Sequence, residues 1–165
     1  MGLDVGDLAP EFTLKDSKEN YVSLSDFKGK WIVLYFYPKD NTPGCTKEAC
    51  DFTSILSEFS EVGAIVIGVS PDSPSSHKNF IKKHNLKIIL LSDPDKAVLK
   101  LYGAWGKKKN YGREYEGVIR STFLINPDGR VAFIWRNVRV RTKRKGQEIT
   151  HAQIVKEKLK VFLGD

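Results

Sequence analysis

Apolar residues occur along this chain in blocks whose spacing alternates between that of strands and that of helices. Residues 31–37 (WIVLYFY) are all apolar or aromatic, which is typical of a strand buried on both faces, and Pro38 ends the run. From about residue 43 to 60 the inward positions instead recur every three or four residues, at Ala49, Phe52, Thr53, Leu56 and Phe59. This pattern predicts a buried strand followed by a helix.

The same alternation continues to the end of the chain. The further predicted elements are a small hairpin (11–14 and 20–23), strands at 64–70, 88–91, 121–125 and 131–135, and helices at 73–84, after the SDPDK sequence at 92–96, and at 149–163. The Asn126-Pro-Asp-Gly-Arg130 segment is typical of a hairpin turn. This order predicts an α/β fold in which a central mixed sheet, parallel in the middle, is flanked by helices on both faces. It fits a thioredoxin-like fold with an N-terminal β-hairpin and an insertion.

Length and composition favour one domain over residues 1–165, because the chain has no repeat or linker and is long enough to bury a full core. Two cysteines are too few for a disulfide framework, and the N-terminus lacks the pattern of a signal peptide. We therefore expect an intracellular, cytoplasmic protein. Its apolar runs are far shorter than the about 20 residues of a membrane helix, so no membrane partner is expected.

Charge is distributed unevenly within a net charge of +7. Residues 1–75 carry 6 Lys or Arg against 12 Asp or Glu, whereas residues 76–165 carry 21 against 8. Residues 136–145 (RNVRVRTKRK) hold six cations, which could attract a polyanion or an acidic protein. A solvated strand edge and turn is the simpler interpretation, since lysines there also discourage edge-to-edge pairing. Nucleic acid is therefore not an expected partner.

Both cysteines lie in the sequence NTPGCTKEAC at 41–50. Asn41 or Thr42 can act as N-cap and proline suits the first helical position, so Cys45 falls in the first turn, where unpaired backbone N–H groups favour an anion. We expect Cys45 to be an activated nucleophile. Cys50 stands two turns into the helix, away from the helix end and from any predicted cation, and should rest as a buried thiol.

Three other interpretations of the cysteine pair remain. Both could be core residues, since free cysteine is often buried. A zinc site would need four ligands, and the other candidates are His77, His84 and His151, whose spacing is unusual and whose polar neighbours suggest surface positions. A disulfide exchanger of the thioredoxin type has its thiols at C-x-x-C, which differs from this spacing. We therefore expect no metal ion.

Four separated motifs resemble one family. They are P-x3-T-x2-C, formed by Pro38, Thr42 and Cys45; PGCTKEAC; LLSDPDKAVLKLYGAW; and the RSTFLI segment that begins at Arg120. Together they resemble peroxiredoxins of the Q type, also called bacterioferritin comigratory proteins, from about residue 6 to 163. The resemblance implies thioredoxin-dependent reduction of hydrogen peroxide and organic hydroperoxides with no bound cofactor.

The resemblance also assigns roles to individual residues. It implies that Cys45 is the peroxidatic thiolate and Cys50 the resolving thiol, which form an intramolecular disulfide that a thioredoxin-like donor reduces. The supporting residues are Thr42, which orients the peroxide; Pro38, which shields the sulfur; Arg120, which supplies positive charge; and Glu48, which holds that arginine. An edge-strand salt bridge is the alternative for Arg120, although its place before an apolar strand favours an inward cation.

Helix geometry adds a condition to this cycle. An intact helix places the Cα atoms of residues 45 and 50 about 9 Å apart, with their side chains about 140° apart. Disulfides rarely tolerate more than about 7 Å. We therefore expect the turn that holds Cys45 to unwind before the bond closes, leaving residues 42–52 rebuilt or disordered in the oxidised form.

One segment departs from the family pattern. Residues 142–149 are longer and more basic than the short turn usually found before the last helix, which leaves oligomeric state open; we expect a monomer or weak homodimer. The alternative function is a redox-sensing binding module switched by the same disulfide. Sustained peroxide consumption would separate the enzyme from the sensor, which would consume one equivalent per chain.

Overall fold

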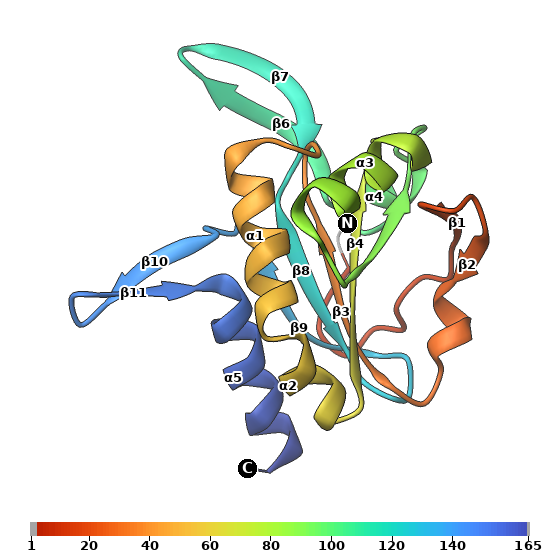
Figure 1. Cartoon of the computed structure of the whole chain (residues 1–165), viewed down its shortest axis with the longest axis vertical. Helices are drawn as coiled ribbons and strands as arrows, with labels where there is room; N and C mark the ends of the chain where they lie inside the picture. The colour runs from red at the N-terminus through yellow and green to blue at the C-terminus, as the bar shows by residue number, and fades with distance from the viewer. Residues whose placement is uncertain (1–2, 165) are drawn as a thin grey trace.

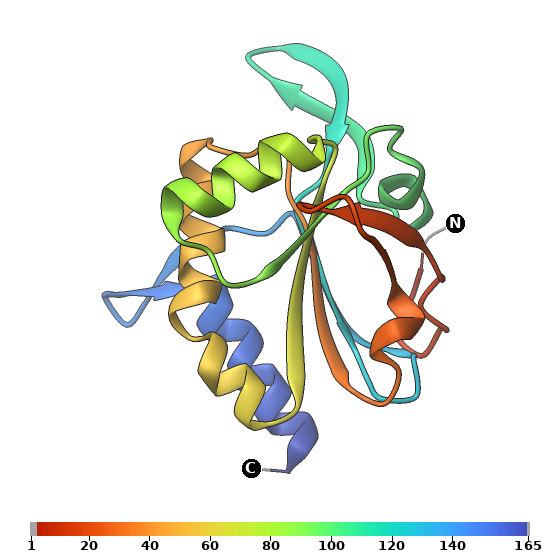
Figure 2. The ribbon, with the colours of Figure 1, turned by 45° about the vertical axis from the view of Figure 1, so that its right-hand side comes forward.

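The computed structural model describes residues 3–164, and the expected domain ends, residues 1 and 165, lie outside them. One sheet of seven strands runs through the molecule in the order β2-β1-β5-β4-β3-β8-β9 (Figures 1 and 2). Its strands are β1 (Thr13–Asp16), β2 (Tyr21–Ser23), β3 (Trp31–Phe36), β4 (Ala64–Ser70), β5 (Ile89–Ser92), β8 (Ser121–Ile125) and β9 (Val131–Arg136). The helices are η1 (Leu24–Phe27), α1 (Pro43–Ser54), α2 (Leu56–Glu61), α3 (Pro74–His84), α4 (Ala97–Leu101) and α5 (His151–Leu163).

The sheet is mixed, as predicted. Strands β3, β4 and β5 are parallel to one another, whereas β8 runs antiparallel to β3 and β9 antiparallel to β8. On the other side, β1 pairs antiparallel with both β5 and β2. The carboxyl end of β3, which leads into α1, therefore lies beside the beginning of β8.

Apolar side chains pack on both faces of this sheet. One cluster combines inward residues of α1, α2, α3 and α5 with side chains such as Val33 and Leu90. A second cluster on the opposite face includes Leu34 and Phe36 together with α4 and η1. Successive residues of β3 point alternately into the two clusters, which explains why this strand has no polar face.

The predicted helix at 43–60 is instead two helices, with a break at Ile55. The Ser54 hydroxyl bonds to the Asp51 carbonyl oxygen at 2.8 Å, and the Ile55 N–H turns to the Thr53 carbonyl. A hydroxyl that bonds back to its own helix competes with the regular ladder and favours a bend. The last helix begins at His151 rather than 149, because residues 149 and 150 belong to a strand.

Two charged hairpins were not predicted. One pairs β6 (Trp105–Asn110) with β7 (Arg113–Val118), and the other pairs β10 (Arg141–Arg144) with β11 (Gln147–Thr150). Both project from the body of the molecule (Figure 1). Each turn has two residues with positive φ, at 111–112 and at 145–146, as a two-residue hairpin requires.

Within residues 3–164, no helix combines the length and the apolar character needed to span a membrane.

Candidate active site

Cys45 lies in the first turn of α1, as the sequence predicts. Thr42 is the N-cap residue with extended backbone angles, and Pro43 occupies the first helical position. The Thr42 hydroxyl does not cap the helix, because it donates to the Lys39 carbonyl oxygen at 2.8 Å. The Cys45 side chain is only 2% exposed, so bulk water has little access to its sulfur.

Arg120 approaches this sulfur from the segment just before β8. Its Nη2 donates to Cys45 Sγ at 3.2 Å, and its Nη1 donates to Glu48 Oε1 at 2.5 Å. A Cβ atom at Gly44 would lie 3.4 Å from Nη2, so the glycine leaves room for the guanidinium. Burial lowers the pKa of Arg120, but Glu48 and Cys45 outweigh it and the net shift is upward. The arginine is thus a permanent cation beside the sulfur.

Glu48 holds this cation from one turn further along α1. It is 1% exposed, and burial raises its pKa to about 7 although Arg120 acts in the opposite direction. Its Oε2 has no hydrogen-bond partner within residues 3–164. One carboxylate oxygen therefore fixes Arg120, and the three side chains form a line from Glu48 through Arg120 to Cys45.

Neutral groups lie close to these charges. Tyr35 is buried and stacks on Phe52 with ring centroids 4.9 Å apart. His151 Nε2 and the Thr122 hydroxyl are 2.8 Å apart, and burial, together with Arg120, lowers the pKa of His151 to about 4. The imidazole is therefore neutral near pH 7, and Arg120 supplies the positive charge at Cys45.

Cys50 differs from its expected setting. It lies on α1 five residues after Cys45 and is half-buried rather than buried, and both cysteines are free thiols. Burial raises the pKa of Cys50, and Asp51 adds to this, whereas Arg141 acts against it. Arg141 reaches the helix from β10 and binds both carboxylate oxygens of Asp51, at 2.8 and 3.1 Å. A cation therefore lies near this thiol, which the sequence did not indicate.

The surface positions expected for the histidines are wrong in two cases. His77 is fully buried and His151 is 4% exposed, whereas His84 is half-buried. Sequence reasoning also missed Tyr35 and Asp40, which lie near the predicted residues. The geometry brings Cys45, Arg120 and Glu48 into direct contact. Pro38 and Thr42 belong to the loop that leads into α1 and are half-buried.

Three of the six cations in the basic segment at 136–145 are bound within the protein. Arg141 binds Asp51, and Arg144 binds Glu157 of α5 at 3.0 Å. Arg136 donates to the Gly103 backbone carbonyl at 3.2 Å. These contacts agree with a solvated strand edge and turn.

This chain is similar to known proteins in both sequence and structure. The model of the AhpC/TSA family matches residues 5–134. Peroxiredoxin Bcp of Bacillus subtilis (strain 168) is 50% identical over 141 residues, which cover 86% of this chain and 90% of that protein. A PrxQ mutant of Xylella fastidiosa has a TM-score of 0.89 at 36% identity and 99% coverage of both chains. A structure reported for the alkyl peroxide reduction activity of Xanthomonas campestris bacterioferritin comigratory protein has a TM-score of 0.84, with 39% identity and 97% coverage of both chains.

Proposed function

This chain belongs to the AhpC/TSA family as a peroxiredoxin of the Bcp type, and we propose that it reduces hydrogen peroxide and organic hydroperoxides at Cys45. As a peroxiredoxin it is a peroxidase, and hence an oxidoreductase. The reported alkyl peroxide reduction by the X. campestris relative supports organic hydroperoxides as substrates. We place the reaction in the cytoplasm, with a thioredoxin-like protein as the electron donor and a monomer or weak homodimer as the working form.

The first step is attack of the Cys45 thiolate on the terminal oxygen of the peroxide. An S–O bond forms while the O–O bond breaks, and the departing oxygen takes a proton from solvent to leave as an alcohol or as water. Arg120 donates hydrogen bonds that stabilise the thiolate and the charge growing on the departing oxygen. Because the Thr42 hydroxyl donates to Lys39, its oxygen is free to accept the O–H of the peroxide. Pro38 shields the sulfur from water.

The second step joins the two thiols. Cys50 attacks the Cys45 sulfenic acid, a disulfide forms, and the hydroxyl leaves as water. Both thiols lie on the intact helix α1, about 9 Å apart at their Cα atoms by helix geometry, so the bond requires the first turns of α1 to unwind. A dithiol donor then reduces the disulfide and the helix re-forms.

The observation that carries this proposal is the guanidinium of Arg120 placed between the Cys45 sulfur and the Glu48 carboxylate. A buried thiol in an apolar core would need no such partner. The arrangement instead supplies a fixed positive charge where a thiolate and a departing oxygen carry negative charge.

Turnover with a generic thioredoxin system tests the proposal. Catalytic amounts of the protein are expected to consume hydrogen peroxide and two organic hydroperoxides continuously while reductant is in excess. The Cys45→Ser variant is the control and should be inactive. Consumption of one equivalent per chain, followed by arrest, would instead support the redox-sensing module.

A further inference from the structure

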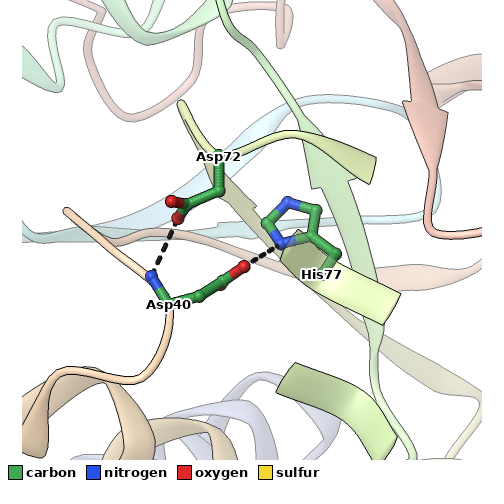
Figure 3. Close-up of side chains that lie close together, drawn as sticks. All are labelled: Asp40, Asp72 and His77. Atoms are coloured by element: carbon green, nitrogen blue, oxygen red, sulfur yellow. Dashed lines mark hydrogen bonds and ion pairs between the residues drawn. The ribbon is translucent and has the colours of Figure 1, made fainter. Parts of the chain in front are cut away.

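A buried polar network lies behind the loop that precedes α1 (Figure 3). It joins Asp40 of that loop, Asp72 after β4 and His77 of α3. His77 Nδ1 lies 2.7 Å from Asp40 Oδ2, and its Nε2 lies 2.9 Å from the Leu91 backbone carbonyl oxygen in β5. The Tyr37 hydroxyl also lies 3.4 Å from Nδ1, and because His77 is 0% exposed its ring nitrogens are shielded from solvent.

The two contacts define where the protons are. A carbonyl oxygen only accepts hydrogen bonds, so Nε2 of His77 carries a hydrogen. Nδ1 faces a carboxylate oxygen, and a contact of 2.7 Å needs a further proton between them. Asp40 also accepts bonds from the hydroxyls of Tyr37 at 2.6 Å and Ser76 at 2.8 Å, which stabilise its anionic form. Asp40 and His77 thus form a charge-assisted pair.

This pair is connected directly to the catalytic loop. The Asp40 backbone N–H donates to Asp72 Oδ2 at 2.8 Å, and Asp72 accepts the Ser70 hydroxyl at 2.7 Å at the end of β4. Asn41 then adopts a left-handed conformation with φ of 63°, and Thr42 follows it as the N-cap residue of α1. Both the side chain and the backbone of Asp40 therefore determine where the loop delivers Thr42 and the first helical turn.

Neither a metal site nor stability alone accounts for the pair. Both ring nitrogens of His77 and both carboxylate oxygens of Asp40 already have hydrogen-bond partners. A buried ion pair is often no more stabilising than apolar residues of the same volume. Its bonds instead end on three different elements and the loop, so the network fixes their relative positions.

We propose that His77 is a positioning residue for the peroxide reaction, which holds Asp40 and thereby fixes the loop that carries Pro38 and Thr42 into α1. The proposal rests on the proposed function, since it takes Cys45 as the group that meets the peroxide. Attack requires the sulfur and the peroxide to be aligned at close range, and a displacement of about 1 Å can lower a rate on the order of 100-fold. His77 acts on the rate only through this alignment.

Two amide substitutions distinguish the roles of the hydrogen bonds that the two ring nitrogens of His77 make. His77→Asn places an N–H donor near the position of Nδ1 and keeps the bond to Asp40, whereas His77→Gln places its donor near Nε2 and keeps only the bond to Leu91. We expect His77→Gln to lower the second-order rate constant for peroxide about tenfold or more, and His77→Asn by no more than about threefold. In a Cys50→Ser background, the thiolate absorbance of Cys45 should titrate at a different pH in His77→Gln and at an unchanged pH in His77→Asn.

Two further variants make the test decisive. His84→Gln, at the end of the same helix, is the matched control and should react with peroxide at the wild-type rate. Tyr37→Phe removes one hydrogen-bond donor from Asp40 without changing the ring volume, and it should slow the reaction with peroxide about fivefold. This variant tests the network in case His77→Gln does not fold. Equal slowing in both His77 variants, or wild-type rates in His77→Gln and Tyr37→Phe, would overturn the proposal. Absence of turnover in the wild type would instead overturn the proposed function, and the Cys45 titration would still test His77.

Discussion

Replacement of Arg141 by alanine should speed closure of the Cys45–Cys50 disulfide and leave the attack on peroxide unchanged. Arg141 binds both oxygens of Asp51, the residue directly after Cys50 on α1. Because Arg141 belongs to β10, this ion pair ties a projecting hairpin to the helix that must unwind. Loss of the pair lowers the free energy needed to open α1.

The size of the effect follows from the exposure of the pair. The Arg141 side chain is 34% exposed and that of Asp51 11%, so water screens the interaction in part. A two-bond pair of this kind contributes about 1 kcal/mol, near the upper end for exposed pairs. Since 1.36 kcal/mol is a factor of ten, the opening equilibrium should rise about fivefold. Arg144→Ala is the matched control, because Arg144 of the same hairpin pairs with Glu157 of α5.

The assay follows the sulfenic acid after one equivalent of hydrogen peroxide. A dione reagent added at set times traps the remaining sulfenic acid, and mass spectrometry measures the trapped fraction. The lifetime should be about fivefold shorter in Arg141→Ala than in the wild type, in line with the fivefold rise in opening, and unchanged in Arg144→Ala. Equal lifetimes in all three proteins would mean that α1 opens without separating Arg141 from Asp51, and would refute this reasoning.

The remaining predictions concern the thiols, Arg120 and the buried imidazole. Amide hydrogens of residues 42–56 should exchange faster in the oxidised than in the reduced protein, and equal protection would contradict the unwinding of α1. Cys45→Ser should abolish peroxide reduction, whereas Cys50→Ser should gain one oxygen and stop as a sulfenic acid; mass spectrometry that finds the first oxygen on Cys50 of the wild type would reverse the assignment. Arg120→Ala should move the thiolate absorbance to higher pH and slow peroxide attack on the order of 100-fold, and near-normal values of both would remove Arg120 from the site. Because the pKa of His151 is about 4 in the folded protein and about 6.5 when unfolded, the unfolded state takes up this proton first as pH falls. The wild-type protein should therefore lose about 3 kcal/mol of its free energy of unfolding through His151 when the pH falls from 6.5 to 4. The His151→Gln variant should not show this part of the loss, and urea titrations of both proteins at the two pH values measure the difference.

Elements with a clear apolar pattern were predictable from the sequence. The strands at 64–70 and 121–125 have the predicted bounds, because each is a short run of apolar residues between turn signals. The hairpins β6–β7 and β10–β11 were not predictable in this way, since their strands are mostly charged and show no apolar alternation. Their turns did carry a signal, in Gly112 and Gly146.

The candidate site was predictable only where its chemistry is local. An N-cap candidate followed by proline placed Cys45 in the first turn of a helix, but its contact with Arg120 joins residues 75 positions apart and was expected only from a family resemblance. Burial of His77 was missed because its neighbours are polar, although it stands three residues before the buried Phe80 and so shares the inner face of α3. The pairing of Arg141 with Asp51 depends on a hairpin whose position no local pattern determines.

The order in which strands join the sheet also sets when the protein becomes reactive during its synthesis. Cys45 and α1 leave the ribosome early, whereas Arg120 follows 75 residues later and reaches the sulfur only when β8 pairs with β3. At roughly 5–20 residues per second, this interval lasts about 4–15 s. Throughout it the nascent chain carries Cys45 without its guanidinium partner, so the growing polypeptide presents a thiol that lacks the donor described above. Translation thereby delays the complete peroxide site until residues 121–125 have been made and β8 has paired with β3.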